Sequence, residues 1–268
     1  MTSLLQPPLI TRLLAAERIL IAGAGGGFDV YAGLPLALAL RDAGKEVHLA
    51  NLSFSELHAL PAEVWQEPEL ALITPDTPSP EGYFPERTLA RWLRLHGMPD
   101  QVWAFPRTGV RPLRAAYRSL VARLGIDAHH GVNHSLVLEN LAAIDRAGGY
   151  LGAFSVPRDS REGTLYLDAV EHARAVFPEH PSIVQGSVAA ALRGLFGDVR
   201  FTDRTKGGKL FVNPLMTLYF GVTVEALVAE HRYLDRLEGT VLMRQVATVI
   251  SDFQDSLPVR RSPRQFPH

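Results

Sequence analysis

Cysteine is absent from the 268 residues of this chain, which excludes disulfide bonds, thiolate catalysis and zinc sites built from cysteine. An excess of either charge is also missing, because 27 basic and 28 acidic residues leave a formal charge of −1. That balance gives no electrostatic reason to expect nucleic acid or an anionic membrane as a partner. No apolar run approaches the ~18 residues that a transmembrane helix needs.

A signal-peptide pattern is lacking as well. The first 17 residues contain Pro7 and Pro8 and do not follow the order of charged and then apolar residues that a signal peptide shows. Together with the missing disulfides, this predicts a cytoplasmic protein. Since the balanced charge gives no reason to expect nucleic acid or a membrane, the predicted partner is a small molecule. The sequence leaves the oligomeric state open, a homo-oligomer included.

Apolar residues make up 47% of the chain, enough for a large core, and they fall into alternating strand and helix patterns. Strands are predicted at 18–22, 46–51, 70–74, 101–105 and 150–155, and helices at 30–43, 86–96, 111–124 and 133–147. This alternation predicts an α/β, three-layer Rossmann-like fold with a mostly parallel sheet and helices on both faces. We expect one domain over residues 1–256. Residues 257–268, with three prolines and three arginines, are predicted to form a loose tail.

The second half is predicted to contain helices at 166–177, 182–196, 216–231 and 240–253, and a hairpin that pairs 198–203 with 209–213. The last helix carries Leu242, Val246, Val249, Ile250 and Phe253 on one stripe, so we expect it to pack on the core. One place breaks the alternation. Only residues 125–132 lie between two predicted helices, and no apolar strand fits there.

In open parallel sheets, ligands bind beyond the carboxyl ends of the strands. The polar residues just past the predicted strand ends are therefore the site candidates. They are Asp29, Asn51, Ser53, Arg107, Thr108, Ser155 and Asn213.

A glycine-rich loop between the first strand and the first helix is the strongest signal. Gly23, Gly25, Gly26 and Gly27 would let backbone amides approach a ligand, and the helix start that follows adds positive potential. The loop is not the dinucleotide fingerprint, because the sixth position is Phe28 and the second strand ends without an acidic residue. The missing acidic residue also counts against an S-adenosylmethionine site. The alternative is a tight turn without a ligand.

Asp29 follows this loop and opens the predicted helix. A carboxylate there can act as a helix cap stabilised by the dipole, with no other role. Alternatively it faces the ligand, where it would repel a bare phosphate and suit a ribose hydroxyl, an ammonium group or a divalent cation.

Histidines cluster in the run 129–134. His130 and His134 are candidates for general acid–base catalysis, and their alternative is an ordinary structural role. Zinc chelation at this spacing needs a helix, but Gly131 precedes the predicted one and Glu139 would lie on its opposite face. The sequence therefore predicts no metal site.

Two further cations flank a glycine pair. Arg204 and Lys206 precede Gly207 and Gly208, so they could clamp a phosphate or carboxylate. Their alternative is the solvated tip of the predicted hairpin.

Several segments together resemble a known family. They are Gly23–Asp29 with Val30–Leu38, His130–His134 leading to Leu138–Asn140, Gly149–Phe154, Asp168–Glu171, Pro181–Val184 and Val212–Met216. In these segments the chain is similar to the bacterial and archaeal family catalogued as domain of unknown function 1152. The resemblance covers most of the chain from about Arg18 to Asp235.

The resemblance implies a Rossmann-like protein in which the glycine loop, the histidine segment and the Asn-Pro segment surround one pocket. It carries forward Gly25, Gly26, Asp29, His130, His134, Asn140 and Asn213. The chain departs from the family between Leu124 and His130, where the family has a further strand and a segment rich in glycine and aspartate. Two explanations are open. Either the gene lacks this segment, so that part of the implied pocket is missing with it, or the protein contains the segment and the numbering is closed over it.

These features predict an enzyme that acts on a small polar metabolite bearing a ribose, phosphate or carboxylate group. The glycine loop would bind the ligand, Asp29 would orient it, and His130 or His134 would move a proton. One alternative is a non-catalytic nucleotide- or metabolite-binding regulatory protein, and another is an enzyme that uses NAD or S-adenosylmethionine. The sequence names neither the reaction nor a cofactor.

Overall fold

The computed structural model describes residues 7–25, 27–79, 82–126, 130–133, 138–180, 182–199 and 210–257, with the backbone alone at 130–133, 138–140, 183 and 210. Its strands are β1 Arg18–Gly23, β2 Glu46–Leu52, β3 Trp65–Glu67, β4 Leu70–Ile73, β5 Val102–Phe105, β6 His130–Asn133, β7 Tyr150–Ser155, β8 Gly197–Val199, β9 Leu210–Val212 and β10 Leu218–Thr223. The helices are α1 Pro8–Ala15, α2 Asp29–Ala32, α3 Leu34–Asp42, α4 Pro85–Leu95, α5 Val110–Leu124, α6 Leu138–Arg146, α7 Arg161–Val176, α8 Ile183–Leu192, α9 Val224–Ala229, α10 Leu234–Glu238 and α11 Met243–Ser256. Short 3₁₀ turns cover Leu57–Ala59, Ala62–Val64 and Pro214–Thr217.

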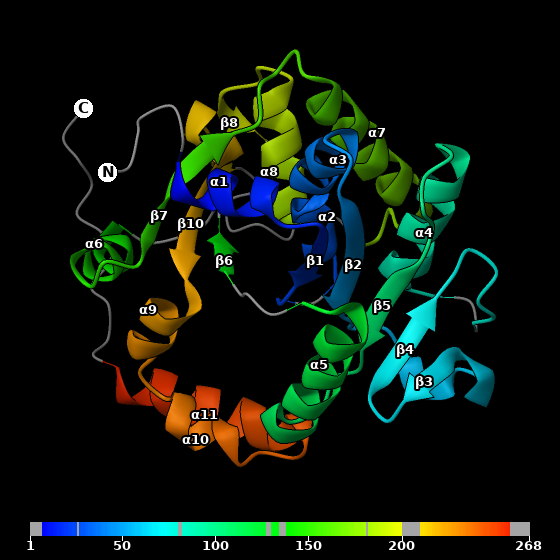
Figure 1. Cartoon of the computed structure of the whole chain (residues 1–268), viewed down its shortest axis with the longest axis vertical. Coiled ribbons are helices and arrows are strands. Elements are labelled where there is room, and N and C mark those ends of the chain that lie inside the picture. Colours follow the sequence, from blue (N-terminus) through cyan, green and yellow to red (C-terminus); the bar gives the residue numbers. More distant parts are fainter. Residues whose placement is uncertain are drawn as a thin grey trace.

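The main sheet has five strands in the order β1-β2-β5-β4-β3 (Figure 1). The pairs β1–β2 and β2–β5 are parallel, whereas β5–β4 and β4–β3 are antiparallel. The α/β class is therefore confirmed, and the sheet is mixed rather than mostly parallel.

The path between β4 and β5 explains the antiparallel pair. Ile73, at the end of β4, lies opposite Val102, at the start of β5. After β4 the chain comes back along the sheet before α4 begins, since Glu86 at the start of α4 bonds to Asn51 at the far end of β2. Helix α4 then returns the chain to the start of β5. The stretch between β4 and α4 therefore runs in the direction of β5, which in a parallel sheet would be the direction of β4 itself.

A second sheet has three antiparallel strands in the order β6-β10-β7. The strand predicted at 150–155 is confirmed as β7, but it joins this sheet. Two predictions are wrong here. Residues 218–223 form β10 inside the helix predicted at 216–231. The burial pattern alternates as in a strand, since Tyr219 and Gly221 are buried and Leu218 and Phe220 are partly exposed, before a register shift at Val222. Strand β6 lies where no strand was expected, and α6 begins at Leu138 rather than 133.

The base of the predicted hairpin is confirmed, since β8 and β9 pair antiparallel as a separate two-stranded sheet. Helix α11 differs from its prediction. It contains no buried residue, and Val246, Val249, Ile250 and Phe253 are only partly covered. The helix packs beside α10, where Phe253 contacts the ring of Tyr233. The expected packing of this stripe on the core is therefore wrong.

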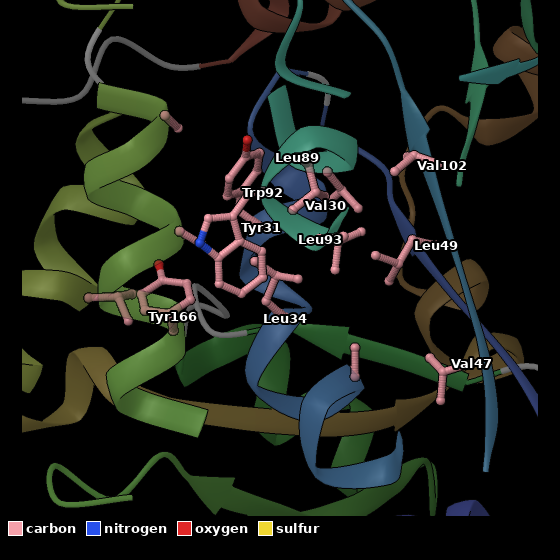
Figure 2. Close-up of a cluster of buried hydrophobic side chains, with 14 of the residues drawn as sticks. Val30, Tyr31, Leu34, Val47, Leu49, Leu89, Trp92, Leu93, Val102 and Tyr166 are labelled. Atoms are coloured by element: carbon pink, nitrogen blue, oxygen red, sulfur yellow. The ribbon is translucent and has the colours of Figure 1, made fainter. Parts of the chain in front are cut away.

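The largest core lies between the main sheet and helices α3, α4 and α7 (Figure 2). Val47, Leu49 and Val102 point from the sheet toward Trp92 of α4, which is 1% exposed. The indole Nε1 of Trp92 donates to Asp168 of α7 at 2.7 Å, so its one polar group is satisfied.

Residues of the opposite parity face helix α5. Trp103 and Phe105 of β5 pack against Ala116 and Leu120, as side chains on alternate faces of a strand must. Among the described residues, no helix is both long enough and apolar enough to cross a membrane.

A distant segment caps the start of α5. The backbone amides of Gly109 and Arg111 donate to the carbonyls of Val241 and Thr240, at 2.9 and 3.0 Å. The Thr240 hydroxyl also accepts from the amide of Val110 at 3.0 Å. These bonds satisfy amides that the first turn of a helix cannot pair internally. A Cβ on Gly109 would meet the carbonyl oxygen of Thr240 at 2.5 Å, so glycine is needed there.

Candidate functional site

The glycine loop leaves β1 and enters α2 at Asp29. A Cβ on Gly23 would lie 2.5 Å from the side-chain oxygen of Asn51, and one on Gly25 would overlap the carboxylate of Asp29. Gly27 has a φ of 60°, and a Cβ there would lie 2.6 Å from the Tyr83 hydroxyl. These three glycines are therefore required by close contacts within the protein itself. Their predicted role, to let backbone amides approach a ligand, stays a prediction.

Asn51 lies beneath this loop and is completely buried. Its Nδ2 donates to the carbonyl of Gly27 at 2.8 Å and to Oε1 of Glu86 at 2.7 Å. Among the described residues, its Oδ1 has no hydrogen-bond donor. Asn51 thus fixes the loop from below, and the structure does not place it on the cavity described next.

Glu86 is also completely buried, at the first turn of α4. Burial raises the pKa of its carboxyl, and hydrogen bonds from Asn51, Ser53 and Ser55 oppose that rise. The Ser55 hydroxyl donates to Oε2 at 3.3 Å, and the Ser53 hydroxyl accepts from the amide of Ser55 at 3.0 Å. A buried polar network therefore joins α4, the end of β2 and the glycine loop.

Aromatic rings surround the loop on its other side. The ring of Phe28 lies 5.4 Å from Tyr31 and 5.6 Å from Tyr83, and the ring of Tyr83 lies 5.1 Å from His180. Burial, with a smaller contribution from Glu86, raises the pKa of both tyrosines. Both hydroxyls therefore keep their protons at neutral pH. They act as hydrogen-bonding and packing groups rather than as bases.

A cavity of about 1080 Å³ lies beside the loop and along β1. Gly23, Gly25 and Asp29 line one end of it. Arg12, Glu17 and Arg18 line it around the start of β1. Apolar side chains, including Phe154 of β7 and Tyr219 of β10, form much of the remaining wall.

Asp29 provides the acidic group at the glycine end. The wall also contains the carboxylate of Glu17 and the phenol of Tyr219. Burial raises the pKa of the Tyr219 hydroxyl. The described part of the chain contains no group of three or more histidine, aspartate or glutamate side chains placed to hold a metal ion. The arrangement can therefore orient a hydroxyl or ammonium group at Asp29.

A smaller cavity of about 210 Å³ lies between α7, α8 and the ring of Phe28. Arg174, His180 and Arg193 line it together with apolar residues. The Nη2 of Arg193 bonds to the carboxylate of Glu171. Phe28 is the residue of the glycine loop that lines this cavity, and the described glycines of the loop do not.

Other predicted site residues lie elsewhere or are not described. Asn213 caps the 3₁₀ turn at Pro214, since its Oδ1 accepts from the amide of Leu215 at 2.9 Å. The backbone of His130 lies in β6, opposite Thr223, and that of Asn140 lies in α6. The remaining predicted residues lie outside the described part of the chain; these are Gly26, His134, Arg204 and Lys206.

Three further candidates past the strand ends contact segments that are distant in the sequence. Arg107 pairs with Glu56 at 2.6 Å on the surface. The Thr108 hydroxyl donates to the carbonyl of Val241 at 3.2 Å, and the Ser155 hydroxyl lies 2.9 Å from that of Thr217. Each contact joins two segments of the fold, and none of the three residues lines either cavity.

The sequence reasoning missed Glu86, Ser55 and Tyr83. An acidic residue after Pro85 has the usual explanation of a favourable helix start, so its burial carried no local signal. Ser55 lies only two residues beyond Ser53, and that spacing past the end of a strand could have suggested a second hydroxyl in the network. Tyr83 lies in an irregular segment without periodicity.

Comparison of the chain with models of protein families, with curated protein sequences and with solved structures gives no match. The resemblance to domain of unknown function 1152 therefore stays a prediction, and the site has to be interpreted from its own geometry.

Proposed function

We propose that the chain binds a small polar metabolite in the cavity beside the glycine loop and acts on it as an enzyme. The observation that carries the proposal is that Gly23, Gly25 and Asp29 line one end of the 1080 Å³ cavity, on a loop held from below by Asn51. A ligand pocket needs such a concave, mainly apolar space with a few fixed polar groups. The ligand would place a hydroxyl or ammonium group at Asp29.

The remaining parts of the proposal follow from the sequence. The fold would be a three-layer Rossmann-like domain related to domain of unknown function 1152 and located in the cytoplasm. His130 or His134 would carry the proton in the reaction, and Asn140 would lie at the same pocket. A cofactor such as NAD or S-adenosylmethionine is the less favoured version, since Asn51 is buried under the loop and is not available to a ribose.

A non-catalytic metabolite-binding protein is the second candidate. One observation favours it: no histidine is present among the described residues that line the cavity. If His130 and His134 do not reach the ligand, the cavity can bind but lacks a group that titrates near neutral pH.

The test is a thermal-shift screen of the full chain with nucleosides, sugar phosphates, amino acids and polyamines. A ligand at 100 times its dissociation constant should add ~2.7 kcal/mol to the free energy of unfolding. Asp29→Asn should reduce the affinity for a hit at least tenfold, whereas Asp255→Asn, on exposed α11, should leave it unchanged. Equal affinities in the two variants would reject Asp29 as a ligand group.

A second pair of variants separates catalysis from binding. His130→Gln and His134→Gln should retain the affinity for the hit and lose turnover if either histidine carries the proton. Unchanged turnover in both variants would rule out both histidines as proton carriers and favour a structural role for them, whereas a natural chain that binds the hit without any turnover would support the non-catalytic candidate.

A further inference from the structure

Strand β1 has an open side. Within the described parts of the chain it pairs with β2 alone, and it forms one end of the five-stranded sheet. Edge strands in proteins are commonly protected by lysine, proline or a bulge. The sequence of β1, Arg-Ile-Leu-Ile-Ala-Gly, has none of these, and its pairing with β2 is regular throughout.

The 1080 Å³ cavity follows this open side. Every residue from Ala15 to Gly25 lines it. Consecutive side chains of a strand point to opposite faces, so the feature that all of them share is the backbone edge. Every second residue of that edge directs its N–H and C=O away from β2 and into the cavity. The cavity thus offers a row of backbone donors and acceptors along the ~20 Å of a six-residue strand.

We propose that this cavity binds an extended peptide segment of another protein, which adds to β1 as a sixth strand. The charges of the cavity require a basic residue of the segment beside Asp29 and an acidic one beside Arg12 and Arg18. Antiparallel pairing is the more stable per residue, and in that direction the first residue of the segment lies beside Asp29 and its last beside Arg12 and Arg18. The segment therefore has a basic first residue and an acidic last one. The residues between them are apolar, because both faces of the added strand would be covered.

The walls of the cavity exclude other occupants. Residues of α1, β7, β10 and α8 also line the cavity, so a single segment enters but a second copy of the sheet does not. An acyl chain would leave the edge amides and carbonyls of β1 buried without partners, which is unfavourable for each group. The C-terminal residues 258–268 contain three prolines, which cannot donate to a ladder.

This inference does not rest on the proposed function, although the peptide and the metabolite would share the cavity and Asp29. The peptide also needs the backbone of Arg18–Ala22, whereas the metabolite would lie against Gly23, Gly25 and Asp29. Removal of the Asp29 carboxylate would weaken the binding of both ligands, whereas a blocked peptide backbone would weaken the binding of the peptide alone. Failure of either proposal can therefore be recognised separately.

The probe is the synthetic peptide acetyl-Lys-Val-Ile-Val-Ile-Glu-amide, added to the full-length protein. Hydrogen exchange should show at least tenfold slower exchange of alternate β1 amides when the peptide is bound, with no change in the amides that already pair with β2. Two N-methylated versions provide the matched control, one methylated at peptide residues 2 and 4 and the other at 3 and 5. Only one of them faces β1 with its methyl groups, so one should lose affinity at least tenfold and the other should keep it.

A charge exchange tests the direction. The reversed peptide, with glutamate first and lysine last, should bind more weakly to the natural chain, and Arg18→Glu should shift the preference toward it. Arg232→Glu, whose side chain is exposed and does not line the cavity, should leave the preference unchanged.

Three results would overturn the inference. They are equal binding of both N-methylated peptides, slow exchange of all β1 amides before any peptide is added, and protection of the same amides by dodecanoate instead of peptide. The second result would mean that another part of this chain already covers the edge.

Discussion

Strands β1 and β5 belong to the same sheet and have the same apolar character, yet their surroundings are opposite. All four residues of β5 are buried. In β1 only Ile19 is buried, Leu20 and Ile21 are partly exposed, and Ala22 is exposed. The difference comes from their neighbours, since β5 lies between β2 and β4 whereas β1 has a strand on one side only. An apolar run in the sequence therefore indicates that a strand can be buried, and the strands that pair with it decide whether it is buried.

The largest expected effect is a difference in stability between two leucine-to-alanine substitutions, one in the covered strand β2 and one in the edge strand β1. Leu49 of β2 is completely buried and faces Trp92, so Leu49→Ala should lower the free energy of unfolding by about 2–5 kcal/mol. Leu20 of β1 is only partly buried beside the cavity. Leu20→Ala should therefore cost about 1–2 kcal/mol, since less apolar area is lost from the core. Urea denaturation of both variants measures the difference.

Equal losses in the two variants would break the comparison. They would mean that β1 is as well covered in solution as β2, and the cavity would then be filled by another part of the chain. Ile21→Ala provides a check on the other face of β1, and it should resemble Leu20→Ala.

The second expected effect concerns Glu86, which joins the closed side of the sheet to the glycine loop. Its folded pKa is raised by burial, so the folded state holds a proton that the unfolded state releases near its ordinary pKa. Stability that is present below the ordinary pKa is lost as the pH rises toward the folded pKa. Glu86→Gln keeps a neutral side chain of the same shape at every pH. Between the ordinary and the raised pKa, the free energy of unfolding of this variant should therefore increase relative to that of the natural chain by up to ~1.4 kcal/mol per pH unit.

Urea denaturation at several values between pH 4 and pH 8 measures this trend. Glu63→Gln, at an exposed position, is the matched control and should give a difference that does not vary with pH. A constant difference for Glu86→Gln as well would show that the carboxyl titrates normally, and so that solvent reaches it.

The smallest expected effect concerns the contact between α4 and α7, which closes the core over β2 and β5. Hydrogen bonds from Trp92 and then from His96 lower the pKa of Asp168, whose side chain is 58% exposed. The stability that Asp168 contributes is present above the ordinary pKa of aspartate, and it is lost as the pH falls through the lowered pKa of Asp168 in the folded state. Asp168→Asn still accepts from Trp92, so at pH 7 it should cost less than ~1 kcal/mol.

Thermal unfolding at pH 7 and pH 3 tests this sign. The loss at pH 7 should shrink at pH 3, where the natural carboxyl begins to take up a proton. Asp145→Asn, on exposed α6, should show no such dependence. A larger loss at pH 3 than at pH 7 would contradict the assigned cause.

The first βαβ unit could be predicted from the sequence because its signals are local. An apolar run ends in glycines at Gly23, and a second run ends at Asn51, so β1, β2 and their parallel pairing follow from periodicity and turn residues. The prediction also located the loop that lines the larger cavity. The helix between the strands is divided into α2 and α3 at Gly33, where a Cβ would overlap the side chain of Ile21.

The second half could not be predicted in the same way, because its strands are defined by distant partners. Residues 218–223 combine apolar and aromatic side chains that suit a helix as well as a strand, and β6 and β7 decide the outcome. The same reason hides Glu86 from the sequence. Its partner Asn51 lies 35 positions earlier, and no local pattern joins the two.

The cap at the start of α5 has a consequence for the order in which the protein can fold. The hydroxyl that accepts from Val110 lies 130 positions later in the chain, at Thr240. During synthesis, the first turn of α5 therefore emerges long before the segment that completes it, and its amides remain hydrated until then. Contacts of such long sequence separation form slowly. The first turn of α5 is thus completed only after residues 240 and 241 have been synthesised, and a ribosome that stalled before Thr240 would hold a nascent protein with an uncapped helix.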